Sequence, residues 1–259
     1  MRFLWEESPE RGRRVADQSV FARVEKKYLI DENQARMMAD ALRLRGFSML
    51  DFGDPAIQSL YYDTEDYLLI RRSLERPNYK EKLRLRAYGR PAPEGRSYVE
   101  IKKKYRGVVY KRRVQLPLRD AVSALKKGEM PSDCGQIGRE IDRCVAFYGL
   151  SPKCMILYDR DAWTSDREDV RVTFDRRIRC RFDRLDLTLP QEGALLLPEG
   201  QMIMEVKVPG AYPLWLTRLL SGIGARRVHF SKYGTAYTRF IFRGGEQAAQ
   251  AAKEACSIA

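Results

Sequence analysis

Charged and apolar residues alternate along several segments of the chain, which is the pattern of strands whose two faces differ. In residues 82–86, lysine and arginine alternate with leucine, so a strand there has one cationic and one apolar face. Residues 100–104 and 109–115 repeat this pattern. Like charges on neighbouring strands repel, so a bound polyanion is the simplest compensation. A basic face exposed to water would explain any one of these strands, but their recurrence favours an anion-binding sheet.

The same patterns predict the remaining elements. Further strands are expected at residues 21–30, 59–63, 155–163, 170–175 and 202–208. Apolar residues at helical spacing predict helices after Asp31, within 120–127, within 137–149 and after Pro213. Asp31 and Gln34 form a capping-box pattern at the first of these helices. Many strands with few helices and no internal repeat predict an α+β fold, a closed antiparallel β-barrel with helices packed outside.

The composition of the two ends predicts three parts. Residues 1–20 are charged and rich in arginine, and we expect a basic arm there. Residues 244–259 are rich in alanine and glutamine and are expected to form a C-terminal tail. The barrel domain is expected over residues 21–243, because no clear linker interrupts that stretch.

Net charge and residue usage limit the chemistry. A net charge of +13 points to a polyanionic partner such as nucleic acid, polyphosphate or nucleotide. Five cysteines without metal-type spacing predict free thiols and a reducing cytoplasm, and we expect neither a signal peptide nor a membrane span. The single histidine, His229, makes a catalytic triad or a multi-histidine zinc site improbable, so the chemistry must rest on carboxylates, lysines and arginines.

Because alternate residues of a strand share a face, charged residues from at least seven predicted strands can be assigned to the same face of the sheet. In a closed barrel they would point into one wet, anion-binding lumen, where arginine suits phosphate oxygens and glutamate could hold Mg²⁺ or Mn²⁺. These residues are Arg23, Glu25, Lys27, Arg84, Arg86, Glu100, Lys102, Lys111, Arg113, Arg160, Arg171, Glu205 and Lys207.

An ordered set of motifs resembles the VTC domain, the polyphosphate polymerase domain of the vacuolar transporter chaperone family, in a bacterial stand-alone form. That family belongs to the CYTH-like triphosphate tunnel superfamily. The motifs span about residues 21–242. They are Glu-Lys-Lys-Tyr at 25–28, Ser-Leu-Tyr-Tyr-Asp at 59–63, Lys-Leu-Arg-Leu-Arg at 82–86, Val-Glu-Ile-Lys at 99–102, Tyr-Asp-Arg at 158–160, Val-Arg-Val-Thr-Phe-Asp at 170–175, Met-Glu-Val-Lys at 204–207 and Phe-Ser-Lys-Tyr at 230–233.

The resemblance implies a role for each matching residue. The residues that match catalytic and phosphate-binding positions of the tunnel are Lys27, Arg84, Arg86, Lys102, Arg160, Arg171 and Lys232. Lys111 matches another phosphate-binding position, while Arg113 and Lys207 join the group because they share a strand face with it. Glu205 matches the carboxylate that binds Mn²⁺ or Mg²⁺. For Glu25 a metal contact and a salt bridge are equally good readings.

The first strand separates the candidate activities. The superfamily begins with an ExExK strand, and here Arg23 replaces the first glutamate. This loss of a carboxylate fits a polymerase that moves the γ-phosphoryl group of ATP to polyphosphate better than a two-metal triphosphatase. A tunnel triphosphatase and a non-catalytic polyphosphate or nucleotide binder remain alternatives. The cations occupy alternate positions of many strands and are not clustered on a helix with aromatic residues for base stacking. This distribution argues against a nucleic-acid-binding protein.

Other residues keep plainer interpretations. Tyr61, Tyr62 and Tyr88 are expected to pack, and Glu100 to pair with a lysine. Asp63 and Asp175 could serve in turns or pairs as readily as in a metal site. The sequence leaves the oligomeric state open, and any coupling to a membrane would need a separate protein.

Overall fold

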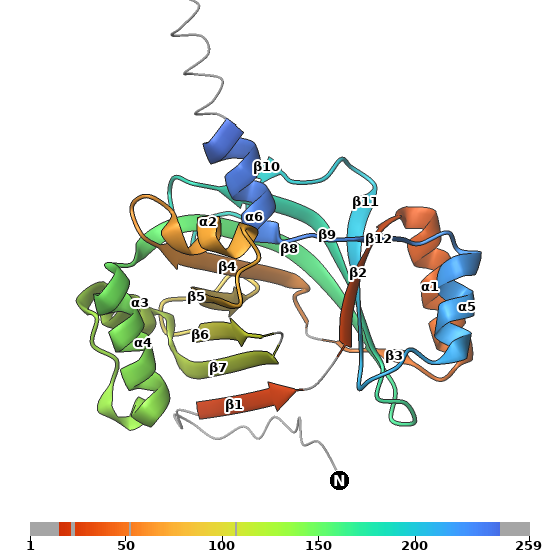
Figure 1. Cartoon of the computed structure of the whole chain (residues 1–259), viewed down its shortest axis with the longest axis horizontal. Helices are drawn as coiled ribbons and strands as arrows, with labels where there is room; N and C mark the ends of the chain where they lie inside the picture. Colours follow the sequence, from red (N-terminus) through yellow and green to blue (C-terminus); the bar gives the residue numbers. More distant parts are fainter. Residues whose placement is uncertain (1–15, 22–23, 52, 107, 244–259) are drawn as a thin grey trace, which may run out of the picture.

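The fold is a long, strongly curled antiparallel sheet with helices against its outer face and, in the case of α6, against part of its inner face (Figure 1). The computed structural model describes residues 16–21, 24–51, 53–106 and 108–243. The strands are β1 (Ala16–Phe21), β2 (Val24–Asp31), β3 (Ser48–Met49), β4 (Ala56–Asp63), β5 (Tyr79–Tyr88), β6 (Arg96–Tyr105), β7 (Val108–Pro117), β8 (Ser151–Thr164), β9 (Arg171–Arg181), β10 (Ala194–Leu195), β11 (Gln201–Val208) and β12 (Arg226–Val228). Their hydrogen-bonded order is β1-β7-β6-β5-β4-β8-β9-β11-β2-β12, with β3 beside β8 and β10 beside β9.

Helices lie in three places around this sheet, and each group covers a different part of it (Figure 1). The helices are α1 (Glu32–Leu44), α2 (Leu68–Leu74), α3 (Leu118–Lys127), a 3₁₀ turn at Ser132–Cys134, α4 (Gly135–Tyr148), α5 (Leu214–Gly222), α6 (Lys232–Ala236) and a π-helix at Tyr237–Phe242. The α+β class and the antiparallel sheet are as the sequence predicts. Within the described residues, none of these helices has the length and apolar character needed to span a bilayer.

The expected closure of the barrel is wrong, because the hydrogen-bonded order ends at β1 and at β12. One edge of β2 pairs along its whole length with β11, and the other pairs with the three-residue β12 at residues 27–29, so no ladder joins β1 to β2. The first strand of the order is nevertheless close in sequence to the last strand but one, since only residues 22–23 separate β1 from β2. That link spans at most about 10 Å, so the sheet curls until its ends are near neighbours.

The N-terminal boundary also differs from the sequence-based expectation. Residues 16–20, expected in the basic arm, belong to β1 and pair along β7 from Val114 to Tyr110. The rest of the expected arm and the expected tail at 244–259 lie outside the described residues.

The outer face of β5, β6 and β7 carries the largest apolar cluster. Leu83 and Leu85 are fully buried there, together with Val99 and Ile101 of β6. Helices α3 and α4 cover them through residues such as Ile141. Burial of these alternate residues leaves Lys82, Arg84 and Arg86 on the inner face, as the alternation predicts.

A second apolar cluster lies outside β2, β9 and β11. Tyr28 of β2 and Met204 of β11 pack there against Met38 of α1 and Leu216 of α5. The capping box expected at α1 is present: Asp31 accepts from the Gln34 backbone N–H, and the Gln34 side chain accepts from the Asp31 N–H. This packing fixes the inner-face residues of β2 and β11 opposite each other.

A third apolar cluster fills one part of the inner face and receives α6. Tyr61 of β4 stacks on Tyr233 of α6, with ring centroids 4.7 Å apart. The Tyr233 hydroxyl donates to Asp63 at 2.9 Å, and Asp63 also accepts from the backbone N–H groups of Leu69 and Ile70 in α2. Asp63 thus serves as a buried structural anchor that holds α2 and α6 on the sheet, and burial raises its pKa.

An irregularity between β8 and β9 sets the direction of Arg160. The register shifts between Leu157 and Asp159, and Arg177 on β9 takes a left-handed φ of 48°. Asp159, which is buried, pairs with the Arg177 guanidinium at 2.5 Å on the outside. Beyond this bulge Arg160 stands opposite Asp175 on the inner face.

Candidate anion-binding site

Three buried carboxylates organise the charged part of the inner face, and each contacts two or more cations. The first is Glu100 on β6, which is 2% exposed. Its Oε2 accepts from Arg84 Nε at 2.6 Å, and its Oε1 lies 3.0 Å from Lys111 Nζ. Arg86 lies 4.0 Å away. Burial opposes ionisation of Glu100, but Arg84, Arg86 and Lys111 outweigh it and hold its pKa well below the usual range.

The second cluster centres on Asp175 of β9, which is completely buried. Arg160 of β8 holds it with two hydrogen bonds, Nε to Oδ1 at 2.6 Å and Nη2 to Oδ2 at 2.8 Å. Lys232, the first residue of α6, contacts the same Oδ2. Burial raises the pKa of Asp175, but the two cations overcome it and lower the pKa to about 2.

The third cluster is a ring of alternating charges on β2 and β11. Glu205 lies 2.6 Å from Lys207 and 3.7 Å from Lys27. Glu25 lies 3.7 Å from Lys27 and 3.9 Å from Lys207. Burial disfavours ionised Glu205, but Lys207, Lys27 and Arg160 more than compensate, so its pKa lies well below the usual range.

These clusters share one interior. Burial lowers the pKa of Lys27, but Glu205, Glu25 and, from the second cluster, Asp175 overcome this and raise it. Burial lowers the pKa of Lys102 on β6, and Glu25 of β2 and Glu205 of β11 act in the opposite direction and raise it. Side chains from opposite parts of the curled sheet therefore face one another across a common space.

Cations exceed carboxylates in this space, and the excess shows in the pKa values. Burial, together with neighbouring cations, lowers the pKa of both Lys82 and Lys111 to about 8. Burial would raise the pKa of Tyr61, but Arg84, Lys82 and Arg86 together lower it to about 8. The Tyr61 hydroxyl lies 3.1 Å from Arg84 Nη1. The interior thus favours negative charge even on a phenol, as an anion-binding site should.

The structure brings most of the candidate residues onto this interior. Arg86 is buried and donates to Ser59 Oγ and to the Tyr158 hydroxyl, both at 3.1 Å. Arg171 lies opposite Lys207, and Arg113 opposite Glu100. Arg23 lies outside the described residues. The assigned roles in phosphate binding and catalysis remain predictions.

Several interior residues were not among the predicted site residues. Lys82 donates to Ser231 Oγ at 3.3 Å, and its place on the charged face follows from the same alternation as Arg84. Tyr61, expected only to pack, both stacks and contacts Arg84. Tyr158 lies under Lys232, whose Nζ is 4.3 Å from the centroid of the tyrosine ring. No sequence signal distinguished these tyrosines from ordinary core residues.

Two carboxylates are available to a divalent metal. Glu25 and Glu205 face the same lysines from adjacent strands, and carboxylate oxygens suit Mg²⁺ or Mn²⁺. No group of three or more acidic, cysteine or histidine side chains with metal-site geometry exists in the part of the chain that the structure describes. Mg²⁺ is commonly held by one or two carboxylates together with substrate phosphates, and the Glu25–Glu205 pair fits that arrangement. Lys27 and Lys207 would have to turn toward the phosphates.

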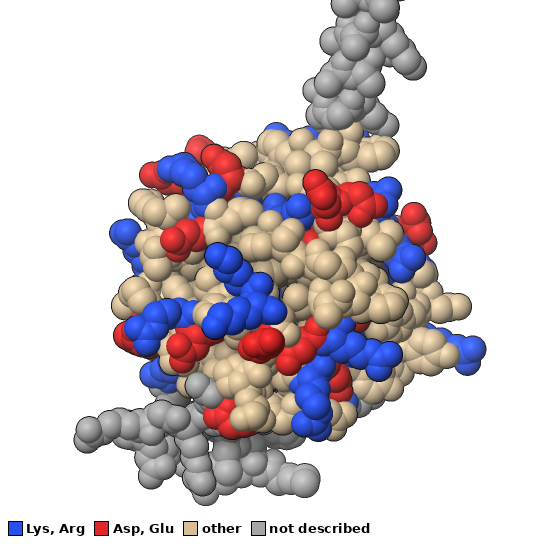
Figure 2. Space-filling model, turned by 90° about the vertical axis from the view of Figure 1, so that its left-hand side faces the viewer, with Lys and Arg blue, Asp and Glu red and all other residues tan. Residues whose placement is uncertain are grey.

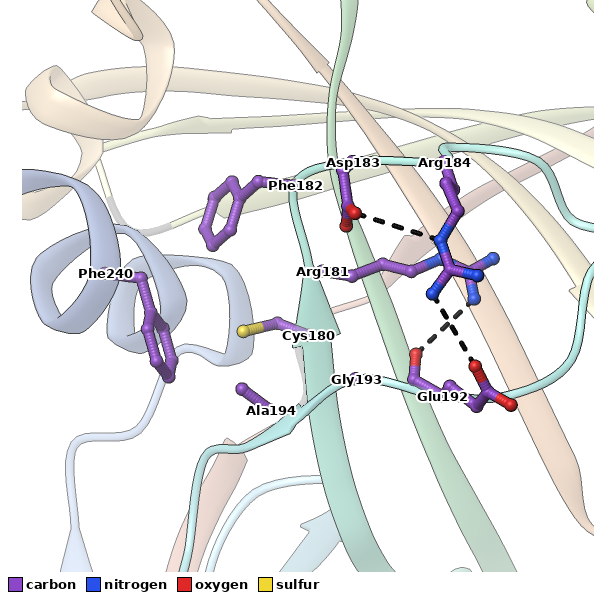
Figure 3. Close-up of a pocket in the computed structure, with 9 residues that line it drawn as sticks. All are labelled: Cys180, Arg181, Phe182, Asp183, Arg184, Glu192, Gly193, Ala194 and Phe240. Atoms are coloured by element: carbon purple, nitrogen blue, oxygen red, sulfur yellow. Dashed lines mark hydrogen bonds and ion pairs between the residues drawn. The ribbon is translucent and has the colours of Figure 1, made fainter.

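A separate pocket of about 220 Å³ lies at the end of β9 (Figure 3). Arg181 in its wall donates to the backbone oxygens of Pro190 and Asp186, both at 2.7 Å. Arg184 pairs with Asp183 and Glu192. Arg181 and Arg184 therefore bind groups of the loop at residues 183–192. The pocket contains none of the predicted phosphate-binding residues.

The outer surface offers a contrast to the interior. Figure 2 views the molecule from the left-hand side of Figure 1 and shows basic and acidic side chains intermixed over that face. Outer-face pairs such as Arg112 with Glu140, and Lys103 with Glu140 at 3.4 Å, neutralise one another locally.

An inward-facing cationic surface on a curled antiparallel sheet defines the class of triphosphate tunnel proteins. A family model described as the VTC domain matches residues 22–241, so the chain belongs to the VTC domain family. This confirms the family expected from the motifs. The match supports an enzyme of the kind that acts on triphosphate or polyphosphate.

Solved structures share the fold at low sequence identity. A candidate adenylate cyclase from Bacillus halodurans is 15% identical, with a TM-score of 0.52 over 86% of this chain and 98% of that one. A candidate adenylyl cyclase from Hippeastrum, described as having a dominant triphosphatase activity, is 16% identical, with a TM-score of 0.49 over 86% of this chain and 96% of that one. The first likeness shows the fold alone. No curated protein matches the chain.

Proposed function

We propose that this chain is a polyphosphate polymerase that transfers the γ-phosphoryl group of ATP to a growing polyphosphate chain in its cationic interior. The observation that best supports the proposal is that each buried carboxylate contacts two or more cations. Glu100, Asp175 and Glu205 fix the cations in place but leave excess positive charge facing the interior. Phosphoryl transfer depends mainly on such positioning and charge neutralisation.

The predicted site residues take distinct parts in this proposal. Arg84 and Arg160 are oriented by carboxylates, so their guanidinium groups would meet phosphate oxygens with little loss of side-chain entropy. Lysines on the same surface would act as mobile point charges. The full phosphate-binding set is Lys27, Arg84, Arg86, Lys102, Lys111, Arg113, Arg160, Arg171, Lys207 and Lys232.

The proposed metal would be Mn²⁺ or Mg²⁺, held by Glu205 with Glu25. A bound divalent ion supplies charge neutralisation at the phosphates. The absence of a cluster of three or more metal-ligating side chains among the described residues favours one metal. One of the two alternative functions, a tunnel triphosphatase of the two-metal type, needs more carboxylates. The remaining alternative is a module that binds phosphates without turnover.

One experiment separates these three functions. The purified protein is incubated with ATP and Mn²⁺, and the products are resolved on a gel stained for polyphosphate while free phosphate is assayed in parallel. A polymerase gives polyphosphate ladders. Free phosphate without ladders indicates a triphosphatase, and neither product with retained triphosphate binding indicates a binder.

A further inference from the structure

An exposed row of large apolar side chains crosses the end of the sheet where β5 begins, β6 ends and β7 begins. Tyr105 stands in register opposite Tyr79 on one side and Val108 on the other, and all three are exposed. Tyr79 and Tyr105 are four residues from Leu83 and Ile101, which belong to the apolar cluster outside β5 and β6. Alternation therefore places the row on the outer face, at the rim of the sheet.

Helix α4 extends this row. Phe147, in its last turn, is 75% exposed and packs edge-on against Tyr148, with ring centroids 4.8 Å apart. The hydroxyls of Tyr148 and Tyr79 both donate to Glu81, at 2.7 and 3.0 Å. This buried carboxylate ties the end of α4 to the start of β5, so the two parts form one surface. We call it the apolar rim, which consists of Phe147, Tyr79, Tyr105 and Val108.

Four cations border the apolar rim. Lys80 stands opposite Lys104 at the same strand ends, and burial lowers the pKa of Lys80, which Lys104 and Arg76 lower further, so these three are neighbours. The Arg106 guanidinium lies 5.3 Å from the centroid of the Tyr105 ring. No carboxylate of the described residues lies within ion-pair distance of any of the four. The surface therefore combines exposed rings with positive charge that has no acidic counterpart in the part of the chain that the structure describes.

We propose that the apolar rim and its bordering cations dock the protein on an anionic membrane surface. Exposed tyrosine rings with cations beside them suit the headgroup layer of a bilayer, where aromatic and basic side chains gather. A protein partner would need a carboxylate placed against each cation, whereas an anionic leaflet offers negative charge at every position. The contact would be direct, without the separate protein that the sequence led us to expect. None of these residues belongs to the proposed phosphate-binding set, so the inference does not depend on turnover.

The test is co-sedimentation of the purified full chain with vesicles of phosphatidylcholine alone and of phosphatidylcholine mixed with phosphatidylglycerol. The proposal predicts at least about a tenfold higher affinity for the anionic vesicles, which falls as salt is added because salt screens the attraction. Saturating triphosphate separates this surface from the cationic interior. It should leave vesicle binding unchanged, since a bilayer meets the rim and not the interior.

Two variants separate the charged and apolar contributions. Arg76→Gln/Arg106→Gln should weaken binding to anionic vesicles by about 10- to 30-fold and flatten its salt dependence, since each basic residue near such a surface is worth about fivefold. Tyr105→Thr/Val108→Thr keeps β-branched side chains that suit a strand but removes apolar surface. It should weaken binding by at least about fivefold while the salt dependence stays. Thermal unfolding checks that both variants fold like wild type.

Matched controls remove the same kinds of side chain elsewhere. Lys126→Gln/Lys127→Gln removes two exposed charges from the end of α3, and Leu44→Gln/Leu214→Gln removes two exposed leucines from α1 and α5. Both should bind vesicles like wild type. Equal losses in these controls, equal binding to neutral vesicles, displacement by triphosphate, or no vesicle binding by folded wild type would overturn the proposal. So would self-association in sedimentation velocity that the rim variants abolish, without vesicle binding, because the rim would then join two copies of the chain.

Discussion

Arg160 and Asp175 form a two-pronged ion pair across β8 and β9 in which the carboxylate is completely buried. Lys232 of α6 contacts the same carboxylate. Asp175 is therefore an internal counterion that orients two cations, which is the pairing role that the sequence left open beside a turn or a metal site.

Removal of this counterion should destabilise the protein in a pH-dependent manner. Asp175 has a folded-state pKa of about 2 against an ordinary value of 3.8, so its ionised form contributes about 2 kcal/mol at neutral pH. That contribution is present above pH 4 and is lost as the pH falls toward 2. Urea unfolding of Asp175→Asn should show a loss of about 2–5 kcal/mol at pH 7 that shrinks at pH 3.

Asp183→Asn is the matched control, because Asp183 is exposed and its contact with Arg184 is 3.8 Å long. It should unfold like wild type. A loss at pH 7 that stays undiminished at pH 3 would point to damaged packing instead of a lost charge.

Arg84→Ala/Arg86→Ala tests the deep phosphate-binding cations. Two lost guanidinium contacts should weaken triphosphate binding by about 100-fold or more at low salt. The double variant should also lose about 3 kcal/mol of stability, since buried Glu100 loses both arginines that lie within ion-pair distance of it. Adding Glu100→Gln should restore stability but not affinity, as calorimetry and urea unfolding would show.

The exposed pair Arg119→Ala/Arg139→Ala, on α3 and α4, removes the same charge from the outside and serves as its control. Affinity that recovers along with stability in the triple variant would argue against direct binding by these arginines.

Triphosphate binding should take up protons between about pH 8 and 10. Lys82 and Lys111 have pKa values of about 8 in the free protein, and a bound anion would return them toward 10.5. Tyr61, also near 8, would rise in the same direction. Affinity should therefore fall as the pH rises through this window. Calorimetry in two buffers of different ionisation enthalpy measures the uptake, which Tyr61→Phe should reduce; heats that do not depend on the buffer would refute the linkage.

Glu205→Gln keeps the size of the side chain and removes its charge. If Glu205 holds the metal, this variant should lose ATP-dependent phosphoryl transfer while metal-free triphosphate binding stays equal or becomes tighter, because a negative charge leaves the interior. Glu140→Gln is the control, since Glu140 also pairs with two cations but on the outer face. Normal turnover in folded Glu205→Gln would limit Glu205 to its pairing with Lys207 and Lys27.

Strand alternation was enough to predict the two faces of the sheet. It placed Leu83 and Leu85 in the core and Arg84 and Arg86 on the interior, because burial on one face of a strand leaves a period of two in the sequence. The motif order then indicated the family.

The features that the sequence did not predict depend on contacts between strands that are distant in the sequence. Alternation cannot reveal that β2 pairs with β11 and β12 and not with β1, so that the sheet stays open. It also cannot reveal that Arg84 and Lys111 share Glu100, or that the bulge at Asp159 aims Arg160 at Asp175. Lys82 was within reach of the alternation, whereas the roles of Tyr61 and Tyr158 arise only from the cations around them.

The central claim is that the interior transfers the γ-phosphoryl group of ATP to a phosphate chain. The most direct measurement follows label from γ-³²P-ATP and, separately, from α-³²P-ATP in the presence of Mn²⁺, with products resolved by chain length. The account predicts that label from the γ position enters chains that lengthen with time, that label from the α position does not, and that Arg84→Ala/Arg86→Ala/Glu100→Gln abolishes the incorporation. Release of all γ label as free phosphate, or no transfer by a folded protein that binds triphosphate, would contradict it.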